Sequence, residues 1–115
     1  MTLIAGVITW YAASIGAPLY CGDTYSTAHD WLALPVEMYE TGQAQCGDVF
    51  AVFTGAGLRY LPALDAGPFS GLCVEDGDAC HPIVADLPRH VYDAGGRSAA
   101  GYVVNTMAAR EEVPR

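Results

Sequence analysis

The chain is 115 residues long, which suffices for one domain with one core and is too short for two. Its 52% hydrophobic and 16% charged residues are typical of a globular protein, not a disordered one. The net charge is −8, with five arginines and no lysine. Nucleic acid and anionic membrane surfaces require a basic footprint, so we expect neither as a partner.

The apolar start of the chain, residues 3–8, is too short to span a membrane, and we expect no membrane insertion. It also lacks the basic region of a secretory signal, because no positive charge precedes Arg59. We therefore expect a chain that stays where it is made, is a mature form, or leaves by another route such as a virion or cell lysis.

Short segments that alternate apolar and polar residues, separated by Gly, Pro, Asn or Asp, predict a mainly β domain. The expected strands cover residues 7–11, 47–54, 58–64, 82–86 and 101–107. Residues 35–42 and 87–96 each have Pro near their start and Gly at their end, which predicts two short helices. Short strands joined by two short helices indicate a small barrel over residues 1–108, with residues 109–115 as a flexible tail.

Four cysteines form neither a CxxC pair nor a spacing with histidine that suits zinc, so no metal is expected. Cys73 and Cys80 bracket an acidic, turn-rich loop whose ends can easily meet, which favours a disulfide between them. Cys21 and Cys46 then pair by elimination. The alternative is four buried free thiols, the usual state in a reducing cytosol.

The segment LDAGPFSG, residues 64–71, places a carboxylate at the end of an apolar, strand-like stretch. On local grounds Asp65 begins a turn, since Asp and Gly-Pro both favour turns. The alternative is a carboxylate held in a cleft.

The order of motifs along the chain favours the cleft. TWY at residues 9–11 is followed by a Cys-containing loop, by ALPVEMYETGQAQCGD at 33–48, by LDAGPF at 64–69 and by IVADLPRHVYDAGG at 83–96. This order resembles the double-psi β-barrel domains of the rare-lipoprotein-A, expansin and family-45 glycosidase group. The resemblance implies a mainly β, six-stranded double-psi β-barrel with two short helices, and it agrees with a Cys21–Cys46 disulfide.

The resemblance also implies a set of site residues. Asp65 matches the acidic residue of the cleft, Asp86 a second aspartate at the head of the last helix, and Thr9 and Tyr11 the opposite wall. Asp65, flanked by Leu64 and Phe69, suits a general acid, because apolar neighbours raise the pKa of a carboxyl. Asp86 would then activate water or stabilise charge on the sugar.

The chain departs from the family pattern in three ways. An insertion between Asp65 and Asp86 makes an acidic, disulfide-tied flap, and Pro88 replaces a helix-capping Ser. The histidine that rare-lipoprotein-A-type lytic enzymes carry in the first helix is absent near Glu37 and Met38. His29 supplies it only if its loop folds back into the cleft.

Several aromatic residues are candidates for sugar contact. Trp10 and Trp31 are expected either to stack on sugars or to pack in the core. Phe69 is expected at the cleft, and the rim is expected to hold three tyrosines: Tyr20, Tyr25 and Tyr39.

These features predict a polysaccharide-active domain that cleaves or loosens a cell-wall glycan such as peptidoglycan, without a cofactor. As an enzyme it would be a lytic transglycosylase or a glycoside hydrolase. The alternative is a non-catalytic module that binds glycan or builds a phage virion or surface assembly, with self-assembly or virion partners. The expected location is extracellular, in the cell wall or on a virion.

Overall fold

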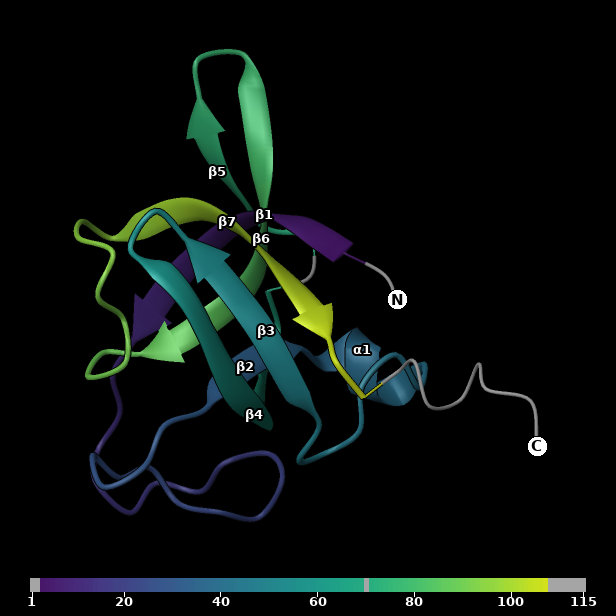
Figure 1. The fold of residues 1–115 in the computed structure, drawn as a ribbon, viewed down its shortest axis with the longest axis vertical. Coiled ribbons are helices and arrows are strands. Elements are labelled where there is room, and N and C mark those ends of the chain that lie inside the picture. The colour runs from purple at the N-terminus through teal and green to yellow at the C-terminus, as the bar shows by residue number, and fades with distance from the viewer. Residues whose placement is uncertain (1–2, 70, 108–115) are drawn as a thin grey trace.

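The computed structural model of the chain describes residues 3–69 and 71–107. The predicted tail at 109–115 lies outside the described residues. The described residues form seven strands and one short helix (Figure 1): β1 (Leu3–Tyr11), β2 (Leu32–Pro35), α1 (Val36–Glu40), β3 (Val49–Thr54), β4 (Gly57–Gly67), β5 (Cys73–Asp76), β6 (Ala79–Pro88) and β7 (Ser98–Asn105).

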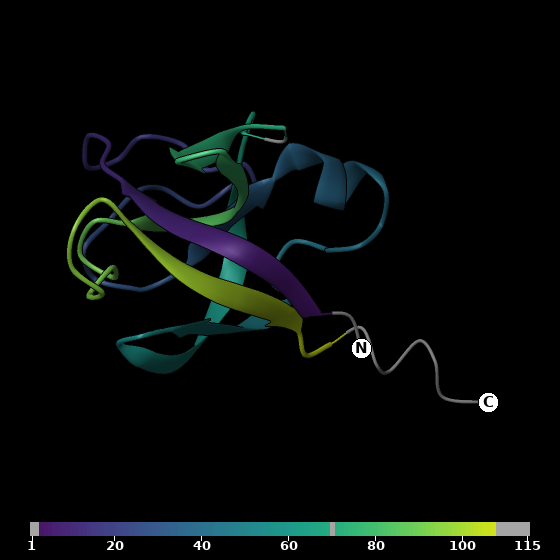
Figure 2. The same ribbon diagram turned by 90° about the horizontal axis from the view of Figure 1, so that it is seen from above.

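Six of the strands form a closed ring. Their order is β1-β7-β3-β4-β2-β6, and β6 pairs with β1 to close the circle. Two of the pairings are parallel, β1 with β6 and β2 with β4, and the other four are antiparallel. β1 and β7 run side by side along their length (Figure 2). The predicted mainly β, six-stranded barrel is thus confirmed, and closure leaves its six strands without a free edge.

The ring closes around one apolar core. Alternation along each strand turns one set of side chains inward, as the pattern of buried residues in β3 and β4 shows. The largest fully buried side chains of this core are Phe50, Ile8, Leu32, Leu34, Leu61, Val91 and Val103. Their burial supplies the main stabilisation of the barrel.

Two glycines allow strands to cross closely at the barrel wall. Gly6 and Gly101 face each other in the β1–β7 pair. A Cβ on Gly6 would collide with the carbonyl oxygen of Pro82, and one on Gly101 with the carbonyl oxygen of Phe53. Glycine is needed here because backbone, not a flexible side chain, occupies the space.

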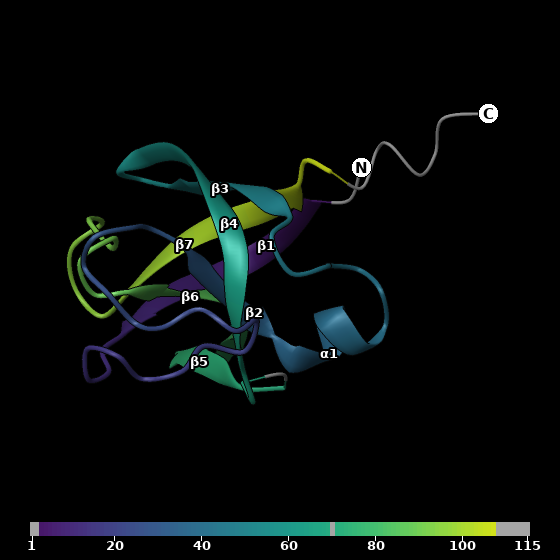
Figure 3. The ribbon, with the colours of Figure 1, turned by 90° about the horizontal axis from the view of Figure 1, so that it is seen from below.

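The second predicted helix, residues 87–96, is wrong. Leu87 and Pro88 still pair with β1 as the last residues of β6. The Pro88 carbonyl then accepts hydrogen bonds from the amides of Val91 and Tyr92, which makes a single turn. Gly95 and Gly96 follow with positive φ, so the helix cannot propagate. The first predicted helix is confirmed as α1, which lies beside the barrel (Figure 3).

The insertion between Asp65 and Asp86 forms a β-hairpin. β5 pairs antiparallel with the first half of β6, and the two strands project from the barrel (Figure 1). Cys73 and Cys80 form a disulfide across this hairpin, as predicted, and Cys21 and Cys46 form the second one. No helix among the described residues is long and apolar enough to cross a membrane.

The long segment between β1 and β2 packs into a small core of its own. Leu19, Tyr25 and Trp31 are buried together, and Tyr11 and Leu64 pack against them from the barrel. Tyr25 was expected on the rim but is 4% exposed. This second core holds the segment beside the ends of β1 and β4, where the candidate site lies.

Candidate functional site

Four strands align the predicted site residues in one row. Thr9 of β1 pairs with Asp86 of β6, Asp86 pairs with Ala33 of β2, and Ala33 pairs with Asp65 of β4. Paired residues on neighbouring strands share a face of the sheet. The two carboxylates therefore lie on the same side of the sheet with β2 between them, about 10 Å apart at the backbone.

Two β-bulges set this alignment. β2 pairs Leu32 with Ala63 and Ala33 with Asp65, so Leu64 is an extra residue in β4. If residues 63–65 alternated regularly, with no bulge, Asp65 would face the core as Ala63 does. β6 has a corresponding irregularity at Val84, between the residues paired with Val7 and Ile8.

A cleft of about 400 Å³ opens over this row. Among the described residues, Asp65 and Asp86 are the charged residues that line it, and Ala33 lies between them on the floor. The remaining lining residues are Tyr11, Ala66, Gly67, Pro68, Phe69 and Leu72. Two carboxylates in a mostly apolar hollow form a site suited to proton transfer.

The ionisation of Asp86 is shifted by its surroundings. The pKa of the Asp86 carboxyl is raised to about 6, mainly by burial; the Thr9 hydrogen bond lowers it in part, and the charge of Asp65 adds to the rise. That bond runs from the Thr9 hydroxyl to Asp86 Oδ1 at 2.9 Å. A carboxyl with such a pKa can hold and donate a proton near neutral pH.

Asp65 has hydrogen-bond donors on both carboxylate oxygens. The Tyr11 hydroxyl donates to Oδ2 at 2.7 Å, and the Tyr20 amide donates to Oδ1 at 2.9 Å. Asp65 is part of β4, and these bonds reach residues far away in the sequence. Asp65 therefore does not begin a local turn.

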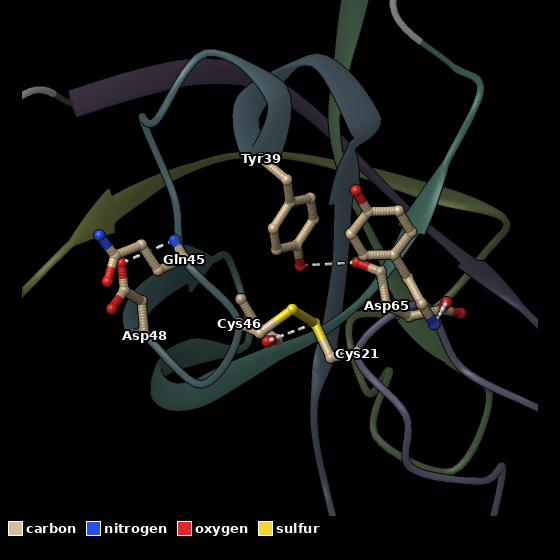
Figure 4. Close-up of a disulfide and its surroundings, with 8 residues drawn as sticks. Cys21, Tyr39, Gln45, Cys46, Asp48 and Asp65 are labelled. Atoms are coloured by element: carbon tan, nitrogen blue, oxygen red, sulfur yellow. Dashed lines mark hydrogen bonds between the residues drawn. A yellow bond between two sulfur atoms is a disulfide. The ribbon is translucent and has the colours of Figure 1, made fainter.

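Tyr39 supports Asp65 from the α1 side. Its hydroxyl donates to the Asp65 backbone carbonyl at 2.8 Å, and its ring contacts that of Tyr20 at 4.9 Å between centroids (Figure 4). Burial raises the pKa of the Tyr39 hydroxyl, and the charge of Asp65 adds to this. Tyr39 is thus held in its neutral, donating form.

The Cys21–Cys46 disulfide lies beside the same group (Figure 4). The Cys21 amide donates to the Leu64 carbonyl at 3.0 Å, next to the Tyr20–Asp65 bond. On the Cys46 side, Asp48 accepts from the Gln45 amide and from the buried Asn105 side chain. The disulfide therefore joins the wall of the cleft to a network anchored in the barrel.

Two of the predicted binding residues lie away from the cleft. Trp10 alternates with Thr9 and Tyr11 to the other face of β1, where its ring packs against the core and contacts the guanidinium groups of Arg89 and Arg97. His29 contacts the Trp31 ring at 5.0 Å and does not line the cleft. Tyr11 and Phe69 are among the residues that line the cleft.

Ala33 and Leu72 also line the cleft, and Trp31 donates a hydrogen bond to Tyr11, none of which was predicted from the sequence. Small or aliphatic side chains carry no chemical signal, so only the strand pairing shows where they lie. Within the part of the chain that the structure describes, no group of three or more His, Cys, Asp or Glu side chains could hold a metal ion.

The closed six-stranded ring with its two parallel pairings has the double-psi β-barrel fold. Two similar solved structures are of an expansin from Clavibacter michiganensis, one of the apo protein and one of a mutant in complex with cellohexaose. The first has a TM-score of 0.63 and 18% identity over 93% of this chain, and the second has 0.63 and 17% over 91%.

The chain spans about half the length of these expansins, 52% of one and 50% of the other. No family model and no curated protein matches the chain. At this identity the likeness shows the fold, and it confirms the resemblance to the expansin group at that level.

Proposed function

We propose that the protein is a polysaccharide-active domain whose cleft binds a glycan across Asp65 and Asp86. The observation that carries this proposal is the pair of carboxylates, aligned on either side of Ala33 in a mostly apolar cleft. The fold shared with an expansin whose mutant was crystallised with cellohexaose supports a glycan as the ligand. Thr9, Tyr11 and Phe69 would contact or shape the binding site.

In the catalytic form of this proposal, Asp86 is the general acid and Asp65 its partner, the reverse of the sequence prediction. Asp86, whose pKa is about 6, donates a proton to the glycosidic oxygen as the C–O bond breaks. Asp65 accepts a proton from the attacking water, whose oxygen forms the new bond to the sugar. In inverting glycosidases the two carboxyl groups lie about 6.5–9.5 Å apart with room for a water between them, and in this cleft one strand, β2, lies between the two acids.

A non-catalytic module is the second candidate. Asp65 already accepts hydrogen bonds on both oxygens. By motif order, α1 has Glu37 and Met38 near the position where rare-lipoprotein-A-type lytic enzymes carry a histidine. A cleft of this kind can bind glycan without cleaving it, and the same barrel can serve a surface or virion assembly. The two disulfides favour an oxidising, extracellular location, such as a cell wall, in either case.

The test is incubation with purified peptidoglycan and with cellulose, followed by mass spectrometry of soluble products. New reducing ends indicate a hydrolase, and anhydro-sugar ends a lytic transglycosylase. Asp86→Asn should lower product formation about a hundred- to ten-thousandfold. Binding to either polymer without products would favour the module and overturn catalysis. Neither binding nor products on any glycan tried would contradict the proposed function as a whole.

A further inference from the structure

Trp31 occupies the centre of the small core between β1 and β2. Its ring is fully buried, 0% exposed, and packs edge-on against Tyr25 and His90 at 5.3 and 5.4 Å between centroids. It does not line the cleft, so it cannot stack on a bound sugar. By packing alone it would be an ordinary core aromatic residue.

Its indole N–H, however, donates to the Tyr11 hydroxyl at 2.8 Å. The Tyr11 hydroxyl in turn donates to Asp65 Oδ2 at 2.7 Å. An indole N–H can only donate, whereas a hydroxyl has one proton and can also accept. Because the Tyr11 oxygen accepts from Trp31, its single proton is directed to Asp65. Trp31 therefore fixes the direction of both hydrogen bonds, from Trp31 to Tyr11 and from Tyr11 to Asp65.

We propose that Trp31 is a positioning residue, which orients the Tyr11 hydroxyl as a permanent donor to Asp65 in the cleft. The role in catalysis or binding rests on the proposed function, whereas the hydrogen-bond relay itself does not. A relay of this kind holds the Asp65 carboxylate in one rotamer and occupies the oxygen that faces Tyr11. The other oxygen, which meets the Tyr20 amide, is set by the backbone.

The electrostatics of Tyr11 agree with this relay. Burial raises the pKa of the Tyr11 hydroxyl well above its ordinary value, and the Asp65 hydrogen bond and charge raise it too. The Trp31 hydrogen bond acts in the opposite direction, as expected for a donor to the hydroxyl oxygen. Tyr11 is therefore neutral at all working pH values and keeps its proton for Asp65.

The relay predicts that a substitution at Asp65 changes the environment of the Trp31 indole N–H. The chain has two tryptophans, so a 1H–15N correlation NMR spectrum shows two indole N–H signals. The Trp10 indole donates to the Gly96 carbonyl and is outside the relay, so it is an internal reference in the same sample. Asp65→Asn and Tyr11→Phe should each shift the Trp31 indole signal and leave the Trp10 signal in place.

Tyr11→Phe should also speed solvent exchange of the Trp31 indole proton, because its acceptor is gone. Tyr60→Phe, the same change on a 63% exposed tyrosine, is the matched control and should affect neither signal. A Trp31 signal that responds to neither Asp65→Asn nor Tyr11→Phe would overturn the relay, whatever the protein does with glycans.

The effect of the relay on function is tested with Trp31→Phe, which keeps an aromatic ring and removes the N–H. We expect about a tenfold loss of turnover, or of affinity if the protein only binds glycan. The double variant with Tyr11→Phe should lose no more than Tyr11→Phe alone, because both act through one bond. Additive losses would contradict positioning. If Trp31→Phe does not fold, Tyr11→Phe and the indole signals still decide the relay, because they leave the core intact.

Discussion

Asp65 and Asp86 show how one residue type obtains different properties from its surroundings. Among the described residues Asp86 accepts a hydrogen bond from the Thr9 hydroxyl, and burial is the main cause of its raised pKa. Asp65 receives a hydroxyl and an amide on its two oxygens. Because the two acids in this cleft have different partners, they can take separate roles as acid and base.

The ionisation of Asp86 has a consequence for stability. Its pKa is about 6 in the folded chain against an ordinary 3.8, so the folded state binds this proton more tightly than the unfolded state. The resulting stabilisation is complete below the unfolded pKa and is lost as pH rises through about 6. Asp86→Asn removes the titration but keeps an oxygen for the Thr9 hydroxyl.

We therefore expect Asp86→Asn to melt above wild type at about pH 8, with a difference that shrinks through about pH 6 and vanishes near pH 4. Calorimetry between about pH 4 and pH 8 measures this difference in melting temperature. Asp78→Asn, on the exposed hairpin, is the control and should show no such trend. A melting difference for Asp86→Asn that stays constant with pH would show that Asp86 does not titrate in this window.

At the residue scale, the sequence places Asp65 and Asp86 in recognisable motifs but does not show which partners surround each acid. LDAGPF and the later Asp86 could be recognised from their motifs. The partners of each acid, such as Thr9, which lies 77 residues from Asp86 along the chain, and the strand between the acids are known only from the fold. The Trp31 relay was equally hidden, because a donor is recognised only when its acceptor is known to lie beside it.

At the scale of elements, the cleft depends on small irregularities in long strands. The bulge at Leu64 reverses the side of β4 on which Asp65 lies. Alternation predicts a strand but cannot locate a bulge, since one inserted residue leaves the composition unchanged. For the same reason residues 87–96, with Pro near one end and Gly at the other, resembled a helix although Leu87 and Pro88 still pair with β1.

Gly67, the last residue of β4, shapes the wall of the cleft. A Cβ there would lie 2.6 and 2.7 Å from two ring atoms of Phe69, so the ring would have to move. We expect Gly67→Ala to cost about 1–3 kcal/mol in urea unfolding, as overpacking does, and to weaken glycan binding by displacing Phe69.

Gly55→Ala is the matched control for this prediction. Gly55 has no neighbour within 4 Å of its would-be Cβ and no positive φ, so the change should stay within about 0.5 kcal/mol of wild type. Equal free energies of unfolding for Gly67→Ala and Gly55→Ala would show that the Phe69 ring moves aside without cost and that this position does not require glycine.

At the scale of the whole molecule, the barrel has no strand edge to hold the segment between β1 and β2. This segment is held by its own small core and by the Cys21–Cys46 disulfide. The other disulfide closes a hairpin that projects from the barrel. The two bridges are chemically identical, and they differ in the length of chain they close and in what lies next to them.

This difference allows the two disulfides to be compared directly. In the chain-entropy model, a bridge across 25 residues stabilises by about 3.5 kcal/mol and one across 7 residues by about 2.5 kcal/mol. The double variants Cys21→Ala/Cys46→Ala and Cys73→Ala/Cys80→Ala should lose about these amounts in urea unfolding.

Binding should separate the two variants further. Tyr20, next to Cys21, donates its amide to Asp65, so release of that bridge frees one wall of the cleft. We expect glycan affinity to fall several-fold in Cys21→Ala/Cys46→Ala and to change little in Cys73→Ala/Cys80→Ala, both measured where each variant remains folded. Equal affinities in the two variants would show that the small core around Trp31 alone holds the Tyr20 amide against Asp65, and the Cys21–Cys46 bridge would then serve stability without serving the site.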